Sequence, residues 1–121
     1  MGFRKHITKN KTVLLAGKDA ENNEELVNQA EKDEWLLHTL FPGSPFVNIK
    51  GKAKKGDVKE AAIFCAKYSR EWKKSKKDVE VHKFKKKDTR KSILMKKGTF
   101  GVKDFKKIRV RKEDIIKFEK I

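Results

Sequence analysis

The chain has 121 residues, enough for one domain with a modest core, and 36% of them are hydrophobic. Charged residues make up 41%, well above the usual quarter, but two tryptophans and eight phenylalanines argue against a disordered chain. One cysteine excludes an internal disulfide, and no apolar run approaches the roughly 18–20 residues that span a bilayer, so we expect no membrane partner.

The net charge of +16 is unevenly distributed. Residues 1–50 hold 7 basic and 7 acidic residues, so the whole excess lies in residues 51–121. Such a surface attracts polyanions, and 28 lysines against 5 arginines favour contacts with a phosphate backbone over base reading. The plain alternative is a solvated Lys-rich surface, although Glu does not keep pace as it does in heat-adapted proteins. No apolar segment of signal-peptide type follows the basic start, so we expect a cytoplasmic protein.

The first half of the chain predicts a strand, a helix and a strand pair. Residues 12–16 read as a short buried strand, and residues 18–34 as a helix that Asp19 caps. Residues 34–40 and 45–50 are two strand-like runs. A stiff turn that holds both prolines of the chain joins them.

A longer helix is predicted over residues 57–74, where apolar residues recur at spacings of three and four. Asp57 is its expected N-cap, and Glu60 completes a pair like that of a capping box. Its basic residues lie mostly off the apolar stripe, so this helix should offer one core face and one basic face.

The last part of the chain predicts mostly strands. Residues 78–84 alternate like an edge or half-exposed strand, and residues 99–111 read as a hairpin that turns near Asp104. Residues 112–121 are expected to form a short last helix, while residues 84–98 are ambiguous.

This order of elements predicts an α+β fold, with a mainly antiparallel sheet packed by two principal helices. We expect a single domain over residues 1–121, with its core at about residues 12–110 and a basic C-terminal end.

The patterns of metal and nucleotide chemistry are missing, so we expect no metal and no cofactor. The three histidines share no close spacing with one another or with Cys65, which lies on an apolar helical stripe as a small buried thiol would. Gly17 and Lys18 follow a strand, but the rest of a phosphate-loop motif is absent, which leaves Lys18 as a single charge for a phosphate.

The turn around Ser44 has two interpretations. A hydrolase would use Ser44 as nucleophile and His38 as base, but the nucleophile-elbow motif and an orienting acid are missing, so we expect no catalytic residue. In the second interpretation, the prolines and Gly43 stiffen the turn and leave Ser44 free to bind a phosphate oxygen or a ribose hydroxyl. A plain tight turn, with His38 as a half-buried strand residue, is the structural alternative.

Four stretches resemble the NFACT-R domain, the RNA-binding module of the NFACT ribosome quality-control proteins. The stretches are LLAGKDAENNEELV, DEWLLHTLFPGSPFVNIK, KEAAIFCAKYSREWK and KGTFGVKDFKKIRV. They occur in the family's order and spacing and cover about residues 14–110. Many members have a histidine after the PGS turn, where this chain has Pro45 and Phe46.

The resemblance implies a non-enzymatic domain that binds tRNA or ribosomal RNA. By position, the implied RNA-binding residues and one neighbouring lysine are Lys18, Asn23, His38, Gly43, Ser44, Ser69, Arg70 and Lys73. The other NFACT parts are not found in this sequence, so the large ribosomal subunit and a protein that carries those parts are further candidate partners. A general DNA-binding protein and a protein-interaction module are the rival hypotheses.

Overall fold

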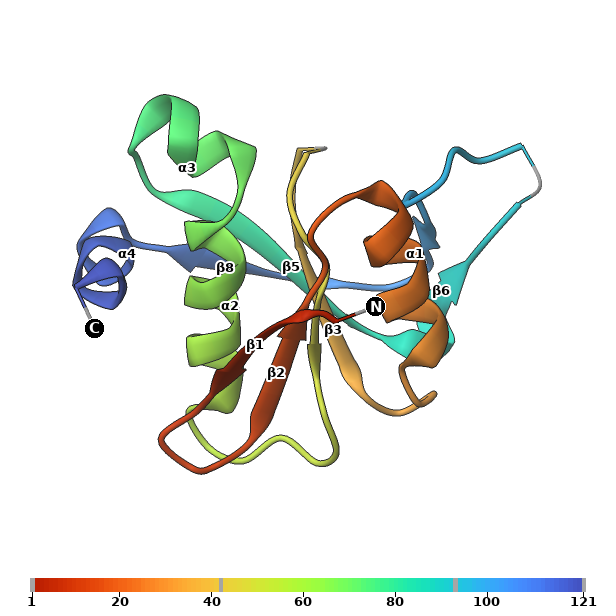
Figure 1. The fold of residues 1–121 in the computed structure, drawn as a ribbon, viewed down its shortest axis with the longest axis horizontal. Helices are drawn as coiled ribbons and strands as arrows, with labels where there is room; N and C mark the ends of the chain where they lie inside the picture. The colour runs from red at the N-terminus through yellow and green to blue at the C-terminus, as the bar shows by residue number, and fades with distance from the viewer. Residues whose placement is uncertain (1, 42, 93, 121) are drawn as a thin grey trace.

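The protein is built around a six-stranded sheet in which every neighbouring pair is antiparallel, as seen in a computed structural model that describes residues 2–41, 43–92 and 94–120 (Figure 1). In spatial order the strands are β1 (Arg4–Ile7), β2 (Val13–Ala16), β4 (Val47–Ile49), β3 (Trp35–Thr39), β5 (Val79–Lys85) and β8 (Lys106–Val110). The predicted α+β class is confirmed.

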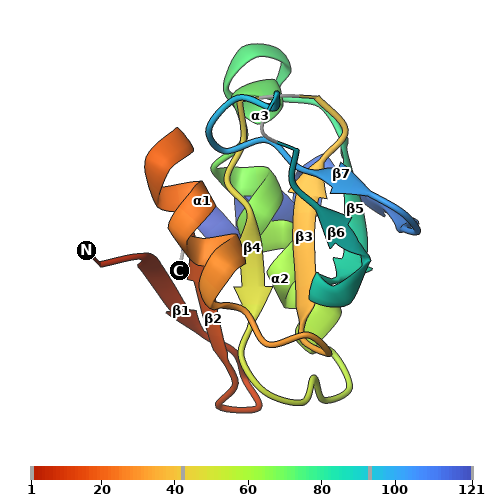
Figure 2. The same cartoon turned by 90° about the vertical axis from the view of Figure 1, so that its right-hand side faces the viewer.

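Helices cover both faces of this sheet (Figures 1 and 2). Helix α1 (Ala20–Gln29) packs with Leu36, Phe46 and Phe84 on one face, where a small sheet of β6 (Thr89–Arg90) and β7 (Gly101–Val102) also lies. Helices α2 (Asp57–Lys67) and α4 (Lys112–Glu119) cover the other face, and the short α3 (Arg70–Ser75) follows α2. A one-turn 3₁₀ helix, η1 (Lys86–Asp88), links β5 to β6.

Several local predictions are confirmed. Helix α1 begins after Asp19, whose carboxylate accepts a hydrogen bond from Asn22 N–H at 2.8 Å. The strand predicted at residues 12–16 is β2, and the strand pair around the stiff turn is β3 and β4. The last helix is α4. Pro42, in that turn, lies outside the described residues.

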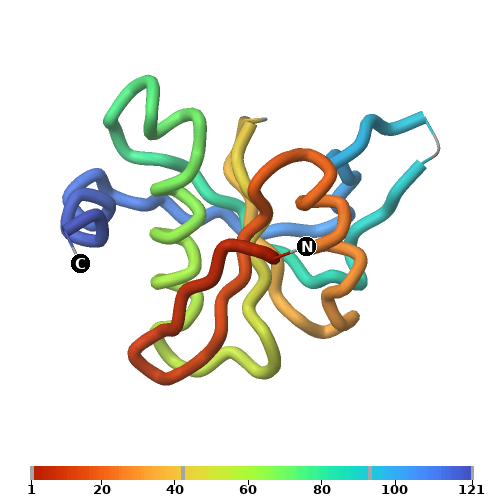
Figure 3. The backbone as a smooth tube through the Cα atoms, viewed as in Figure 1, coloured from red at the N-terminus to blue at the C-terminus, as the bar shows by residue number. Residues whose placement is uncertain are grey.

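The single helix predicted over residues 57–74 is wrong, because the chain breaks at Ser69 into α2 and α3. The Ser69 hydroxyl donates to Ala66 C=O at 2.7 Å and accepts from Trp72 N–H at 3.1 Å, so it caps the second helix. The break turns α3 away from the axis of α2, which the smooth tube of Figure 3 makes clear.

The predicted capping role of Asp57 is also wrong. Gly56 holds the N-cap position at φ 93°, and Asp57 is the first helical residue. Its fully buried carboxylate accepts from the Thr12 hydroxyl at 2.6 Å and from Lys54 N–H at 2.8 Å. Glu60 instead accepts from Lys9 N–H at 3.1 Å. Asp57 therefore ties the β1–β2 turn to the start of α2.

The predicted hairpin over residues 99–111 does not form. β7 pairs with β6, while β8 pairs with β5, so β5 is an interior strand between β3 and β8. The two segments serve different cores: Val102 packs in the cluster under α1, whereas Ile108 and Val110 pack in the cluster under α2. Burial of these apolar side chains on opposite faces of the sheet therefore outweighs the tendency of the sequence around Asp104 to form a hairpin turn.

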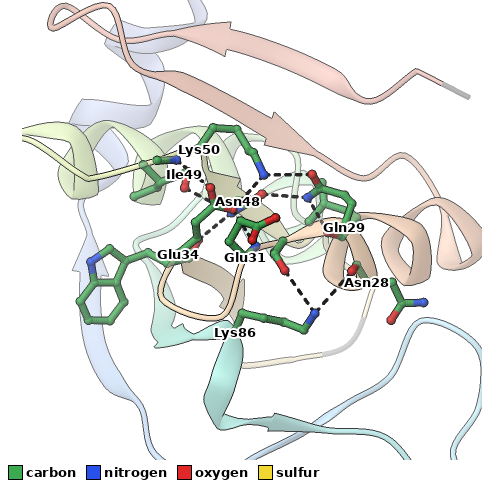
Figure 4. Close-up of polar contacts among 12 residues, drawn as sticks. Asn28, Gln29, Glu31, Glu34, Asn48, Ile49, Lys50 and Lys86 are labelled. Atoms are coloured by element: carbon green, nitrogen blue, oxygen red, sulfur yellow. Dashed lines mark hydrogen bonds and ion pairs between the residues drawn. The ribbon is translucent and has the colours of Figure 1, made fainter.

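A buried polar network fixes one end of the β3–β4 pair (Figure 4). The Glu34 carboxylate accepts from Lys50 Nζ at 2.8 Å and from Gly51 N–H at 2.7 Å. The fully buried Asn48 donates to Glu34 at 3.3 Å and accepts from Gln29 of α1 at 2.8 Å. Because these groups satisfy one another, they hold α1 and the two strands in register. This network fixes the strand pair, and the strand pair positions the turn at its other end.

Candidate nucleic-acid interface

A cleft of about 720 Å³ opens at the turn end of the β3–β4 pair. Four separate segments form its walls: the loop before α1, the turn at residues 43–45, the start of α3 and the loop at residues 97–100. Seven of the eight sequence-predicted residues line it: Lys18, Asn23, His38, Gly43, Ser44, Arg70 and Lys73.

The floor of the cleft is aromatic. The His38 ring stacks on Phe46 with centroids 4.3 Å apart, and Phe46 meets the edges of Phe84 at 6.3 Å and Phe100 at 5.6 Å. Burial lowers the pKa of His38, with a smaller contribution from His82 across the strand pair. The His38 ring is therefore neutral near pH 7, and it offers a stacking and hydrogen-bonding surface.

Ser44 and His38 do come together, with Ser44 Oγ 3.4 Å from His38 Nε2. The buried Ser44 hydroxyl also shares a short hydrogen bond with the Thr39 hydroxyl and lies 3.5 Å from Phe41 C=O. Among the described residues no carboxylate contacts His38. The serine thus closes the turn through the Thr39 hydroxyl and the Phe41 carbonyl. In the described part of the chain, the histidine lacks the acid that would orient a catalytic base.

Asn23 ties the loop before α1 to the turn. Its side-chain oxygen accepts from Phe46 N–H at 3.0 Å, and its amide donates to Ser44 C=O at 3.5 Å. Beside these contacts, Gly17 N–H donates to Phe46 C=O at 3.1 Å, which also links the loop before α1 to the turn. A Cβ on Gly17 would lie 1.9 Å from the Asn23 side-chain oxygen, so glycine is required there by close approach. Asn23 is consequently a positioning residue, only 8% exposed.

The turn also supports the arginine of α3. Gly43 has φ 93°, a left-handed conformation that favours glycine, and a Cβ there would lie 2.8 Å from Arg70 Nε. The exposed guanidinium therefore rests against the turn backbone. Ser69 does not line the cleft: it is fully buried, and it acts from below by starting the helix that carries Arg70 and Lys73.

The cleft is electropositive. Five cationic side chains line it against one carboxylate, that of Asp19, which is already engaged as the cap of α1. The cations are Arg4, Lys18, Arg70, Lys73 and Lys97. None of them has an ion-pair partner in the described part of the chain. Unpaired positive charge facing a cleft is the arrangement that a polyanion would neutralise.

Sequence reasoning missed part of the lining. Arg4 lies over the Tyr68 ring at 4.0 Å, and the loop with Lys97 reaches the cleft because Glu24 of α1 anchors it. Glu24 accepts from Gly98 N–H at 2.7 Å and from Lys91 Nζ at 3.0 Å. These contacts join residues far apart in the chain, so no local sequence pattern predicts them.

The described residues contain no cluster of histidine, cysteine and carboxylate side chains that could hold a metal ion. Burial raises the pKa of the Cys65 thiol well above its ordinary value, so this thiol stays protonated. None of the helices that the structure describes is long and apolar enough to cross a bilayer.

Comparison with known proteins finds one matching family model, described as the NFACT protein RNA binding domain, over residues 2–104. A solved structure, of the C-terminal part of the fibronectin/fibrinogen-binding protein from Streptococcus suis, is similar with a TM-score of 0.83 at 26% identity. The similarity covers 98% of this chain and 49% of that one, so this chain spans about half of the solved chain. Comparison with curated protein sequences gives no significant match.

Proposed function

This chain belongs to the family of NFACT RNA-binding domains, and from that premise we propose that its cleft holds a tRNA or a ribosomal RNA in translation quality control. The matched family is described as one of RNA-binding domains, which supports a role in binding rather than in catalysis. The proposed work takes place in the cytoplasm, with the large ribosomal subunit and a protein that carries other NFACT parts as candidate partners.

The observation that carries the proposal is the convergence of unpaired cations from separate elements. Lys18 comes from the loop before α1, Arg70 and Lys73 from α3, and Lys97 from the loop after β6. Backbone phosphates spaced along an RNA strand match such a distributed set, and the remaining lysines of residues 51–121 add sequence-independent attraction.

The roles of the cleft residues differ in this proposal. Lys18 and Lys73 act as point charges toward phosphates, and the Arg70 guanidinium pairs with a phosphate or stacks on a base. His38 contributes a ring face on the floor. Asn23, Gly43, Ser44 and Ser69 act indirectly, because they shape the turn and start α3.

The test compares two triple variants with the same change in net charge. One replaces Lys18, Arg70 and Lys73 in the cleft with alanine; the control replaces the exposed Lys52, Lys55 and Lys59, which do not line the cleft. Binding of tRNA is measured from low to moderate salt.

We expect the cleft variant to bind tRNA more weakly and to lose roughly 2–3 units of the slope of log affinity against log salt, since each neutralised phosphate contributes roughly 0.7–0.9. The control should stay near wild type. Equal behaviour of the two variants would refute the cleft as the site and leave only a diffuse positive surface.

Competition separates the rival functions. A DNA-binding protein would lose bound tRNA to an equal charge of duplex DNA at fixed salt, whereas the proposed function predicts that tRNA is retained. A protein-interaction module would show a complex that survives nuclease treatment. Arg70→Ala should also change the preference among RNAs, while Lys73→Ala should weaken all of them alike.

A further inference from the structure

Four rings form a row that begins on the floor of the cleft with Phe46, His38 and His82 and ends just outside the cleft lining. Phe46 stacks on His38, and His38 lies directly opposite His82 in the β3–β5 pair, so their side chains share one face of the sheet. His82 in turn stacks on Phe105, with centroids 4.3 Å apart and ring planes 18° apart. The row thus runs from the residue before β4 to the residue before β8.

Phe105 ends this row without being a core residue. It belongs to neither hydrophobic cluster, and 43% of it is exposed although one side of its ring meets His82. The family model matches residues 2–104, so Phe105 also lies just beyond the matched part.

We propose that Phe105 and His82 form a stacking platform for one unpaired base of the RNA, at the outer end of the cleft. This inference rests on the proposed function and specifies the kind of RNA feature that the cleft takes. A base in the middle of a duplex has both faces covered by its neighbours, so only an unpaired or terminal base can add a ring to the stack.

The surroundings of His82 support a preformed platform. His82 Nε2 donates to Glu80 Oε2 at 2.6 Å, which fixes the plane of the ring on which Phe105 stacks. This hydrogen bond, with a smaller contribution from Lys107, lowers the pKa of Glu80, so the carboxylate remains an acceptor near pH 7.

A cation stands beside the platform. Lys107 lies opposite His82 in the β5–β8 pair, and it is exposed and has no ion-pair partner among the described residues. The next cation on that face, Arg109, is held by Asp78 at 2.9 Å. Lys107 is therefore the group available to the phosphate of the stacked nucleotide, as an aromatic beside a cation holds single strands elsewhere.

The experiment uses the full chain and two RNA hairpins with the same stem. One ends blunt, and the other carries a short single-stranded 3′ overhang with 2-aminopurine, whose fluorescence falls when it stacks. Phe105→Ala and Phe105→Leu remove the ring, Phe105→Trp keeps one, and Ile116→Ala is a control of matched exposure, 41% against 43%, on α4.

We expect wild type to bind the overhang hairpin more tightly and to quench its fluorescence. Phe105→Ala and Phe105→Leu should reduce the preference for the overhang hairpin over the blunt one by up to roughly 5- to 150-fold, the range that one base–aromatic stack contributes. The loop and the stem are common to both hairpins, so their contribution cancels in this ratio. Phe105→Trp and Ile116→Ala should keep wild-type binding.

Two outcomes would overturn the inference, and they distinguish a failure of the platform from a failure of the proposed function. If wild type binds both hairpins and neither ring-removing variant changes the preference or the quenching, the platform is wrong while the proposed function stands. If wild type binds neither hairpin, nor tRNA, the proposed function fails and the platform fails with it.

Discussion

Replacing Gly17 with alanine is expected to displace the Asn23 side chain, which holds the turn of the cleft in place. The new Cβ would lie 1.9 Å from the Asn23 side-chain oxygen and 3.0 Å from the Asn23 Cα, so the side chain must leave and the backbone must shift. Gly17 does not have a left-handed φ, so its substitution acts through space alone. The displaced amide is the acceptor for the buried Phe46 N–H.

The magnitude follows from these two effects. A buried N–H left without its acceptor costs about 1–3 kcal/mol, and forcing a methyl group into a packed site costs about 1–3 kcal/mol. The alanine also restricts the unfolded chain, which returns about 0.4–1 kcal/mol. We therefore expect the free energy of unfolding to fall by about 1–5 kcal/mol. RNA affinity should fall as well, because the turn beside Arg70 loses its anchor.

Urea unfolding of Gly17→Ala, Asn23→Ala and the double variant measures this directly. If the Asn23 side chain is the obstacle, Gly17→Ala should cost at least about 1 kcal/mol less in the Asn23→Ala background. Gly2→Ala is the control, since a Cβ there meets no atom within 4 Å. A loss below about 0.5 kcal/mol for Gly17→Ala, with tRNA binding unchanged, would refute the reasoning.

Three further predictions concern single groups. Burial raises the pKa of Asp57, but hydrogen bonds led by that of Thr12 outweigh it and lower the pKa from 3.8 to about 2. About 2 kcal/mol of stability is thus present above pH 4 and lost as pH falls toward 2. Asp57→Asn should lack this contribution, so between pH 5 and 2.5 it should lose roughly 1–2 kcal/mol less than wild type in urea unfolding. The lowered pKa of His38 means that the unfolded chain takes up a proton first, so stability falls with pH below about 6.5, and His38→Phe should flatten the melting temperature between pH 7 and 5. Ser69→Ala should cost about 1–2 kcal/mol in urea unfolding and also weaken tRNA binding. An unchanged affinity would show that the cap is not needed to place Arg70 and Lys73.

Local signals were enough to predict two of the four walls of the cleft, the start of α1 and the turn at residues 43–45. The cap at Asp19 and the stiff turn with Gly43 depend on a few neighbouring residues, and each was readable as a pattern. Ser69 also carried a local signal, since serine often caps a helix, but the apolar stripe that continues to Trp72 concealed the break.

The missed features depend on distant parts of the chain. The loop with Lys97 is placed by Glu24, 74 residues before Gly98, and Arg4 reaches Tyr68 through the pairing of β1 with β2. Phe105 looked like part of a hairpin, yet its ring is placed by His82 on another strand. Such positions are set by tertiary packing, which a pattern of neighbours does not encode.

The family match ends at residue 104, but the packing of the domain continues beyond it. β8 supplies the whole outer neighbour of β5, α4 adds the fully buried Ile115, and Glu119 accepts from Trp72 Nε1 at 3.0 Å. A chain cut at the family boundary would leave β5 as a bare edge and is expected to aggregate rather than fold. In this protein the matched family region and the folded domain therefore have different C-terminal borders, and the proposed stacking residue lies just outside the first and within the second.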